Sequence, residues 1–277
     1  GFANAVGMAI AERHLAARFN RGGRKIVDHF TFVFCGDGDM MEGITSEAAS
    51  LAGHLGLGRL ICLYDDNRVT IDGGTELAFT EDVARRFGAY HWQVLRVKDG
   101  NDLDAIRQAL EAAKAETGKP SLIVCRTHIG YGSPHKQDSH EAHGAPLGPE
   151  EVRLTKERLG LPPDAVFSAS DPVRAHFRRC VDRGAKAEAA WQTKFTGWAQ
   201  KYNQLAEGWR QAIDGTLPSG WDSGLPSFAD GKPVATRAAF GQVLNAVTGR
   251  LPTLMGGSAD LTPSNNTAIK GASDFQK

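Results

Sequence analysis

The chain has 277 residues, enough for one large domain or two modest ones. Its 32 basic and 32 acidic residues cancel without long runs of one sign, which argues against nucleic acid and anionic membrane surfaces as partners. No apolar stretch reaches the roughly 20 residues of a membrane span, and four cysteines without a CxxC pair indicate a reducing compartment, so we expect a cytoplasmic protein.

The predicted elements alternate between helices and short buried strands. Apolar residues at three- and four-residue spacing predict a helix over 1–19. Strands are expected at 30–35, 59–65, 92–97 and 121–127, with helices at 44–55, 81–89 and 102–116 between them. This alternation is typical of βαβ units, so the predicted fold is α/β, with a doubly wound, mainly parallel sheet and helices on both faces.

The second half of the chain has a different character. A loop rich in Gly, Pro and His runs from His128 to Pro149, and its length indicates a functional or mobile segment rather than a simple connection. Polar helical segments follow, and a new helix and strand are expected from Val234 onward. We therefore predict a first domain, a helical linker and the start of a second α/β domain, over residues 1–160, 161–233 and 234–277.

A Gly-Asp-Gly turn, Gly36 to Gly38, follows the first predicted strand. In an open parallel sheet, ligands bind outside the carboxyl ends of the strands, where this turn lies. The glycines would let a phosphate approach the backbone amides, but the carboxylate of Asp37 would repel it. A Mg²⁺ ion removes this conflict because it binds carboxylate and phosphate oxygens together. Asp37 is therefore a candidate metal ligand, although a turn without any ligand is the alternative on this motif alone.

Asn67 follows the next predicted strand and is expected at the same edge of the sheet. The 28 residues between Gly38 and Asn67 leave room for one helix and one strand. An asparagine oxygen is a suitable ligand for a hard cation. The two motifs together indicate a magnesium and diphosphate site more sharply than either does alone.

These residues resemble the motif of thiamine-diphosphate enzymes, in which Gly-Asp-Gly is followed at about this distance by Asn. Three stretches, in the family's order, look like transketolase: "GDGDMMEGITSEAASLAGHLGLGRLICLYDDNRVTIDG", "RTHIGYGSPHKQDSHEAHGAPLG" and "GGSADLTPSN". The resemblance covers essentially the whole chain but only the middle of a transketolase. It implies a thiamine-diphosphate-binding fold, with a diphosphate-binding domain lacking its N-terminal part over 1–160 and a truncated pyrimidine-binding domain over 234–277.

The resemblance assigns the cofactor and metal residues at this edge. Asp37, Asn67 and the backbone carbonyl of Val69 would bind Mg²⁺, with Ca²⁺ as a substitute. The backbone amide of Gly38 would donate to the diphosphate, with Gly36 beside it. Thiamine diphosphate and Mg²⁺ are therefore the expected cofactors.

Four further residues receive roles from the same resemblance. His143 would lie beside the diphosphate and the reacting centre, where it serves catalysis, cofactor binding and substrate binding. Glu42 would act in catalysis and cofactor binding through a carboxylate network near a dimer interface, whereas the residues alone also allow an acid that stabilises a helix N-terminus. Ile129 would pack on the cofactor, and Asp260 would lie near its thiazolium side.

Two residues match positions that bind a sugar phosphate, Arg237 and Ser264. Without the resemblance, an arginine at the start of a helix is usually a surface charge. The loop histidines His135, His140 and His143 could also suggest zinc, but zinc needs four ligands of fixed geometry and no cysteine is near. Solvated loop histidines are therefore the default for His135 and His140.

The implied activity is that of transketolase, in the pentose phosphate pathway. A two-carbon ketol unit would pass from a ketose phosphate such as xylulose 5-phosphate to an aldose phosphate such as ribose 5-phosphate, through a thiamine-diphosphate carbanion. The implied partners are sugar phosphates and a second copy in a homodimer, with the active site at the subunit interface. An activating glutamate and several histidines of the family have no counterpart here, so we expect this segment alone to be inactive. A dihydroxyacetone synthase-like enzyme and a non-catalytic cofactor-binding or assembly fragment are the alternatives.

Overall fold

The computed structural model describes residues 1–229 and 231–277. The chain divides into two compact units, Gly1–Ala190 with Lys277 and Trp191–Gln276. The first contains a sheet with its helices, and the described part of the second contains helices and irregular segments. Within the described ranges, every helix is too short or too polar to cross a bilayer.

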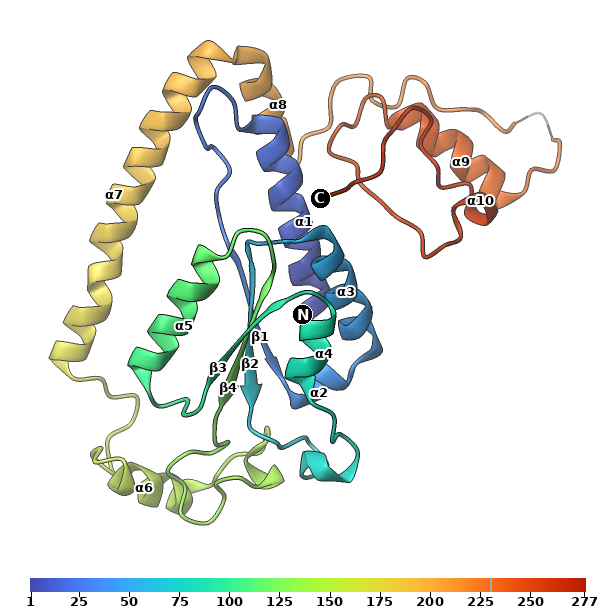
Figure 1. Cartoon of the computed structure of the whole chain (residues 1–277). Coiled ribbons are helices and arrows are strands. Elements are labelled where there is room, and N and C mark those ends of the chain that lie inside the picture. The colour runs from blue at the N-terminus through green and yellow to red at the C-terminus, as the bar shows by residue number, and fades with distance from the viewer. Residues whose placement is uncertain (230) are drawn as a thin grey trace. The chain divides into compact units, whose positions relative to one another are not determined.

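A four-stranded parallel sheet forms the centre of the first unit (Figure 1). Its strands are β1 (Thr31–Gly36), β2 (Leu60–Asp66), β3 (Gln93–Val97) and β4 (Ser121–Arg126). Their order in the sheet is β1-β2-β4-β3, and all three pairings are parallel, so the carboxyl ends of all four strands lie at one edge. The predicted parallel α/β sheet is confirmed.

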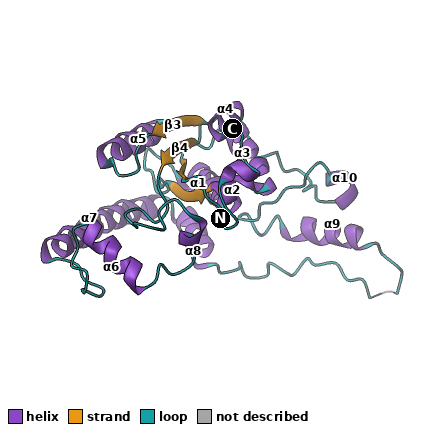
Figure 2. Cartoon of the chain, turned by 90° about the horizontal axis from the view of Figure 1, so that it is seen from below, coloured by secondary structure: helices purple, strands orange, loops and turns teal. Residues whose placement is uncertain are grey.

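Helices lie on both faces of this sheet, as predicted (Figures 1 and 2). One face carries α1 (Phe2–Phe19), α3 (Gly43–Leu55) and α4 (Val83–Ala89), and the other carries α5 (Leu103–Ala115). A short helix, α2 (Asp37–Met41), follows β1 directly and was not predicted. Its five residues are too few and too polar to show the apolar periodicity that indicates a helix.

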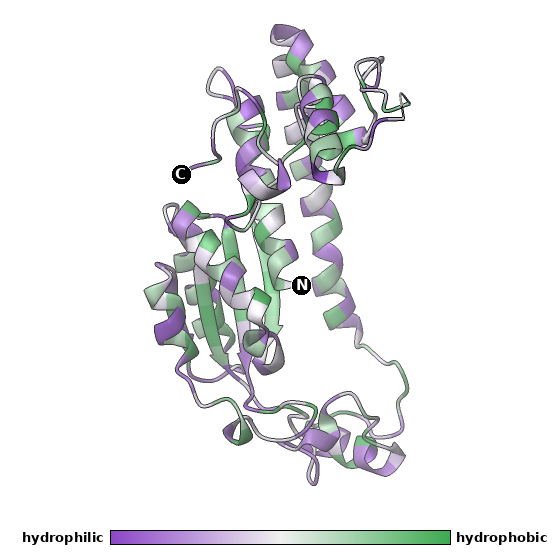
Figure 3. Ribbon diagram, turned by 90° about the vertical axis from the view of Figure 1, so that its right-hand side faces the viewer, coloured by the Kyte–Doolittle hydropathy of each residue, from purple (hydrophilic) through white to green (hydrophobic). Residues whose placement is uncertain are grey.

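Aliphatic side chains fill the space between the sheet and α5. Ile61, Val97 and Ile123 from three strands pack against Ala109 and Ala113 of the helix, and all five are buried. Figure 3 shows the strands mostly in the green of hydrophobic residues. A near-continuous apolar run is what a parallel strand buried on both faces requires.

Aromatic rings join the helices on the opposite face. The ring of Phe2 stacks on Trp92 at a centroid distance of 5.8 Å, and Phe87 meets Trp92 edge-on at 5.1 Å. The indole Nε1 of Trp92 donates to the carbonyl of Ala49 at 2.8 Å. These contacts hold α1, α3 and α4 against one another and against the sheet.

The strand β1 is covered on one face only. Val33 and Cys35 are buried, whereas the alternate residues Phe32 and Phe34 are 48% and 77% exposed. Because α5 packs on β3 and β4, it leaves this face of β1 open to solvent.

The loop after β4 and the following helix complete the first unit. They contain a turn of 3₁₀-helix, η2 (His140–Ala142), and then α6 (Pro149–Arg158). Another such turn, η1 (Thr75–Leu77), follows β2. The long helix α7 (Asp171–Lys201) begins in the first unit and ends in the second.

The second unit contains α8 (Asn203–Asp214), α9 (Thr236–Val247) and α10 (Thr262–Asn265). The strand expected after α9 is absent from the described part of this unit, so that prediction is wrong. Residues 251–257 form turns and irregular structure, with Leu254 and Met255 exposed. A strand needs a neighbour to pair its backbone groups, and none is present among the described residues of this unit.

Two helical glycines provide a test of the packing between α3 and α4. A β-carbon on Gly53 would lie 1.7 Å from the carbonyl oxygen of Tyr90, whereas one on Gly7 of α1 would meet nothing within 4 Å. We expect Gly53→Ala to lower the free energy of unfolding by about 1–3 kcal/mol through overpacking. Gly7→Ala should raise it by about 0.5–1 kcal/mol. Urea unfolding measures both values, and equal effects would contradict the described contact.

Candidate functional site

The carboxyl edge of the sheet brings together polar residues from three strand ends. Gly36 at the end of β1 pairs in register with Asp65 of β2, and Asp66 pairs with Arg126 of β4. Asp37 and Thr127 are the next residues after β1 and β4. The parallel register therefore gathers these side chains from distant parts of the chain.

The carboxylate of Asp37 is buried at this edge, with only 3% of the residue exposed. The hydroxyl of Tyr64 donates to its Oδ1 at 2.6 Å, and the backbone amide of Arg68 donates to its Oδ2 at 2.8 Å. Each oxygen accepts one hydrogen bond and retains a further acceptor site, since a carboxylate has about four. The group is held in place but can still bind a cation.

The surroundings of Asp37 make its negative charge costly. Burial raises the pKa of Asp37 above its usual value, and the nearby carboxylates of Asp66 and Asp65 raise it further. The hydrogen bonds from Tyr64 and Arg68 act in the opposite direction. A cation at this carboxylate would relieve both the burial penalty and the repulsion, so the residues fit a metal ion.

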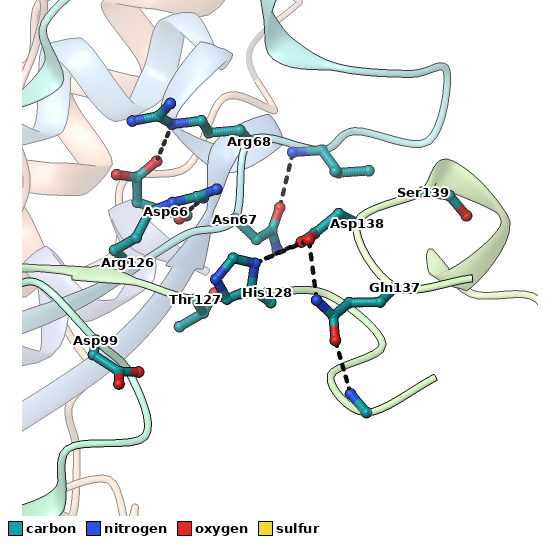
Figure 4. Close-up of polar contacts among 12 residues, drawn as sticks. Asp66, Asn67, Arg68, Asp99, Arg126, Thr127, His128, Gln137, Asp138 and Ser139 are labelled. Carbon is teal, nitrogen blue, oxygen red and sulfur yellow. Dashed lines mark hydrogen bonds and ion pairs between the residues drawn. The ribbon is translucent and has the colours of Figure 1, made fainter. Parts of the chain in front are cut away.

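Asn67 lies beside Asp37 and is held by a chain of hydrogen bonds. Its Nδ2 donates to Asp65 at 3.1 Å, and the hydroxyl of Thr127 donates to the other carboxylate oxygen of Asp65. The backbone amide of Val69 donates to the Oδ1 of Asn67 at 2.9 Å (Figure 4). The three residues predicted to bind the metal are thus neighbours in space around one turn.

The two glycines of the turn border open space. Gly36 has a φ of −100°, and Gly38 does not adopt a positive φ, so neither backbone conformation requires glycine. A β-carbon on either residue would meet no atom of the chain within 4 Å. The absent side chains leave room for a ligand to approach the backbone, which is what a diphosphate needs.

Only one of these two amides is engaged by a side chain. The amide of Gly36 donates to the carboxylate of Asp39 at 2.9 Å. Gly38 is the second residue of α2, where a backbone amide has no acceptor within its own helix. Of the two glycines, Gly38 is therefore the better donor to a bound diphosphate.

The other predicted residues of the first unit lie near this edge but are less enclosed. Glu42 is exposed between α2 and α3, where its carbonyl accepts the amide of Thr45 at 3.1 Å. Ile129 is half-buried in the loop after β4. His143 is exposed directly after η2, and its side chain forms no hydrogen bond with the other described residues, unlike that of Asn67.

The described residues contain no group of three or more His, Cys, Asp or Glu side chains arranged to hold a metal ion. The loop histidines therefore form no such cluster. The predicted magnesium site is of a different kind, because it combines one carboxylate with an amide oxygen and a backbone carbonyl.

The predicted sugar-phosphate residues lie in the second unit. Arg237 stands in the first turn of α9 and Ser264 in α10, and both are exposed. Asp260 precedes α10 with a φ of 59°. The side chain of Asn245 in α9 accepts the amide of Lys270 at 2.8 Å, which ties the segment after α10 to α9.

Comparison with known proteins gives the family. A family model described as "Transketolase, thiamine diphosphate binding domain" matches residues 1–218, well over half of the chain. The chain belongs to the transketolase family. Transketolase of Geobacillus stearothermophilus is 51% identical over 99% of this chain, and the chloroplastic transketolase of Zea mays is 51% identical over 100% of it. The chain spans 41% of the length of each of these curated relatives.

Solved structures agree with this assignment. Transketolase from Pichia stipitis, in complex with sedoheptulose 7-phosphate, matches with a TM-score of 0.94 at 43% identity, over 100% of this chain and 41% of that one. Transketolase from Leishmania mexicana matches with a TM-score of 0.91 at 46% identity, over 97% of this chain and 40% of that one. The predicted resemblance to transketolase and its fold are confirmed.

Several residues that hold the site were not predicted from the sequence. Tyr64, Asp65 and Thr127 orient Asp37 and Asn67, and the backbone of Arg68 completes the set. Tyr64 offered one signal, because it places a hydroxyl in an otherwise aliphatic buried strand next to the Gly-Asp-Gly strand.

The loop after β4 is anchored on α6 by Glu151, which is 9% exposed. Its carboxylate accepts hydrogen bonds from the hydroxyl of Ser133, from the backbone amide of His135 at 2.9 Å and from the imidazole Nδ1 of His135 at 2.9 Å. These bonds, led by that of Ser133, lower the pKa of Glu151 to about 2. His135 is therefore engaged by a carboxylate, although most of its ring faces solvent.

Glu151 makes the anchoring of this loop dependent on pH. Its pKa in the folded state is lower than the usual 4.5, so its stabilising effect is complete above about pH 5 and is lost as the pH falls towards 2. We expect Glu151→Gln to reduce the free energy of unfolding at pH 7, with a difference from wild type that shrinks between pH 5 and pH 3. Urea unfolding at three pH values tests this, and a constant difference would contradict it.

Proposed function

We propose that this chain forms the Mg²⁺ and diphosphate site of a transketolase that transfers a two-carbon ketol unit. The donor would be a ketose phosphate such as xylulose 5-phosphate, and the acceptor an aldose phosphate such as ribose 5-phosphate. The observation that carries the proposal is the buried carboxylate of Asp37, which retains acceptor sites for a cation and lies near Asn67. The turn at Gly38 next to it borders open space. The activity is proposed for the whole protein, since this chain spans 41% of its relatives' length.

The residues at the sheet edge divide the work of cofactor binding. Asp37, Asn67 and the carbonyl of Val69 would hold Mg²⁺, and the amide of Gly38 would donate to the diphosphate. Thiamine diphosphate, when bound, supplies the electron sink that cleavage of a carbon–carbon bond next to a carbonyl requires. Ile129 would exclude water from one side of the cofactor.

Two exposed residues would act nearer the reacting atoms. The imidazole of His143 would donate a hydrogen bond to a phosphate or to an oxygen on which negative charge develops. Glu42 would join a carboxylate network at a subunit interface of a homodimer. Its exposure leaves the carboxylate accessible to a partner.

The second unit would bind the sugar phosphate. The planar guanidinium of Arg237 suits phosphate oxygens, and Ser264 would add a hydroxyl donor, with Asp260 near the thiazolium. Solved transketolases of Pichia stipitis hold sedoheptulose 7-phosphate and, in a variant, fructose 6-phosphate, which supports sugar phosphates as the substrate class. The proposed place of this activity is the pentose phosphate pathway, and the proposed compartment is the cytoplasm.

The metal role of Asp37 can be tested by Asp37→Asn, which removes the charge and keeps the size. We expect the affinity for thiamine diphosphate in the presence of Mg²⁺ to fall at least about tenfold, since even residues that only orient metal ligands have effects of 10- to 100-fold. Isothermal titration calorimetry with Mg²⁺, and with EDTA in its place, measures this. Circular dichroism verifies that the variant folds.

The matched control is Asp104→Asn, which removes an exposed carboxylate in the first turn of α5. It should bind the cofactor as wild type does. Unchanged affinity in Asp37→Asn would refute the metal role. Product formation from xylulose 5-phosphate and ribose 5-phosphate by the whole protein tests the activity, and cofactor binding by the whole protein without product would favour a binding module.

The open space at Gly38 leads to a second prediction. Gly38→Ala adds a methyl group where the diphosphate would lie, so we expect the affinity for thiamine diphosphate to fall. The free energy of unfolding should stay the same or rise by up to about 1 kcal/mol, because alanine favours the helix. Calorimetry measures the affinity, which should fall, and urea unfolding measures the free energy of unfolding, which should not. Wild-type affinity in Gly38→Ala would show that the space is not used.

A further inference from the structure

A small loop closes directly beside the predicted cofactor edge. The backbone amide of Asp138 donates to the carbonyl of Ile129 at 2.9 Å. The Nδ1 of His128 donates to the carboxylate of Asp138, at 2.9 and 3.0 Å from its two oxygens (Figure 4). We refer to these two contacts as the neck of the loop 128–138.

A third residue braces the neck from inside the loop. The Nε2 of Gln137 donates to the carboxylate of Asp138 at 3.3 Å, and its Oε1 accepts the amide of Gly132 at 3.0 Å. The carboxylate of Asp138 thus collects donors from both ends of the loop, and no other residue contributes to the neck through both its backbone and its side chain.

The backbone at Asp138 adopts a conformation that favours glycine. Its φ of 61° lies in the left-handed region, which residues other than glycine adopt less readily, although aspartate and asparagine tolerate it better than most. A glycine would adopt this conformation without cost. The side chain of Asp138 therefore offsets a local penalty through its own contacts.

The neck adds little to the stability of the whole fold. The side chains of His128 and Asp138 are 40% and 41% exposed, and polar pairs this accessible to water contribute little to the free energy of unfolding. A left-handed residue that gives so little global stability is best explained by the local geometry that its contacts maintain.

That local geometry concerns the predicted cofactor contact. Ile129 takes part in the neck directly, because its carbonyl accepts the hydrogen bond from the amide of Asp138. Its chain neighbour His128 makes the second contact of the neck. On the other side of His128, Thr127 bonds to Asp65, which in turn holds Asn67. Consecutive residues after β4 therefore connect the neck, through His128 and Ile129, with the predicted metal ligand Asn67, through Thr127 and Asp65.

We propose that Asp138 is a positioning residue, which holds Ile129 against the place of the cofactor without touching the cofactor itself. The inference rests on the proposed function, because that function assigns Ile129 to the cofactor. If Asp138 only completed a turn, its replacement by glycine would leave the affinity for thiamine diphosphate unchanged. If Asp138 positions Ile129, the same replacement lowers that affinity.

The decisive variant is Asp138→Gly, which removes the carboxylate and relieves the left-handed backbone. We expect an unchanged or higher free energy of unfolding together with a three- to tenfold loss of affinity for thiamine diphosphate and Mg²⁺. Asp138→Asn keeps an acceptor and tolerates the same φ, so it should retain more of the affinity than the glycine variant. Urea unfolding and calorimetry on the 277-residue chain measure both quantities.

The matched control is His91→Gly. His91 also has a left-handed φ, of 67°, but it precedes β3 at the opposite edge of the sheet. It should gain stability in the same way and keep wild-type affinity. A similar loss of affinity in both variants would overturn the proposal.

Hydrogen exchange in the absence of cofactor provides a readout that does not depend on binding. Exchange in the segment 129–138 should rise in Asp138→Gly and in His128→Gln, but not in His91→Gly. Unchanged exchange in Asp138→Gly, whatever the affinity, would overturn the positioning role. If the wild-type chain binds no thiamine diphosphate, the proposed function and the cofactor role of Asp138 fail, and exchange still decides whether Asp138 holds the loop.

Discussion

The buried carboxylate of Asp37 is the constraint around which the rest of the sheet edge is arranged. A buried charge is costly unless it is hydrogen-bonded and compensated. Tyr64 and the amide of Arg68 provide the hydrogen bonds, but neither donor carries a positive charge, and Asp65 and Asp66 add to the repulsion. The chain thus forms an acidic site at which a bound cation would offset the buried negative charge.

Two kinds of structure place the residues of this site. The strand ends are placed by the parallel register of β1 with β2 and of β2 with β4, and by the buried side chains of these strands. The loop after β4 has few buried apolar residues and is placed by polar contacts to Asp138 and Glu151. The polar edge of the sheet is therefore placed mainly by strand pairing and the core, whereas the loop depends on a few hydrogen bonds that pH and substitution can change.

The strands and long helices of the first unit were predictable because apolar runs and periodicity are local signals, and the edge position of Asn67 followed from the rule for strand ends. The contact between Tyr64 and Asp37 could not be predicted from the sequence, because it depends on the register of two strands. The short helix at Asp37 lacks apolar periodicity, and the conformation of Asp138 is one that usually indicates glycine. The prediction of a strand after α9 was wrong because an apolar segment does not form a strand without a neighbouring strand to pair with.

The order of the chain also sets when the site can form during synthesis. The hydrogen bond from Arg68 to Asp37 spans 31 residues, and that from Thr127 to Asp65 spans 62. Such non-local contacts form late, because closing long loops must precede the gain from pairing. On the ribosome, the acidic turn at Asp37 would emerge well before Asn67 and Thr127 and remain solvated until they follow. A cofactor that needs this edge would bind only after the sheet has assembled, so its binding would indicate a correctly folded chain.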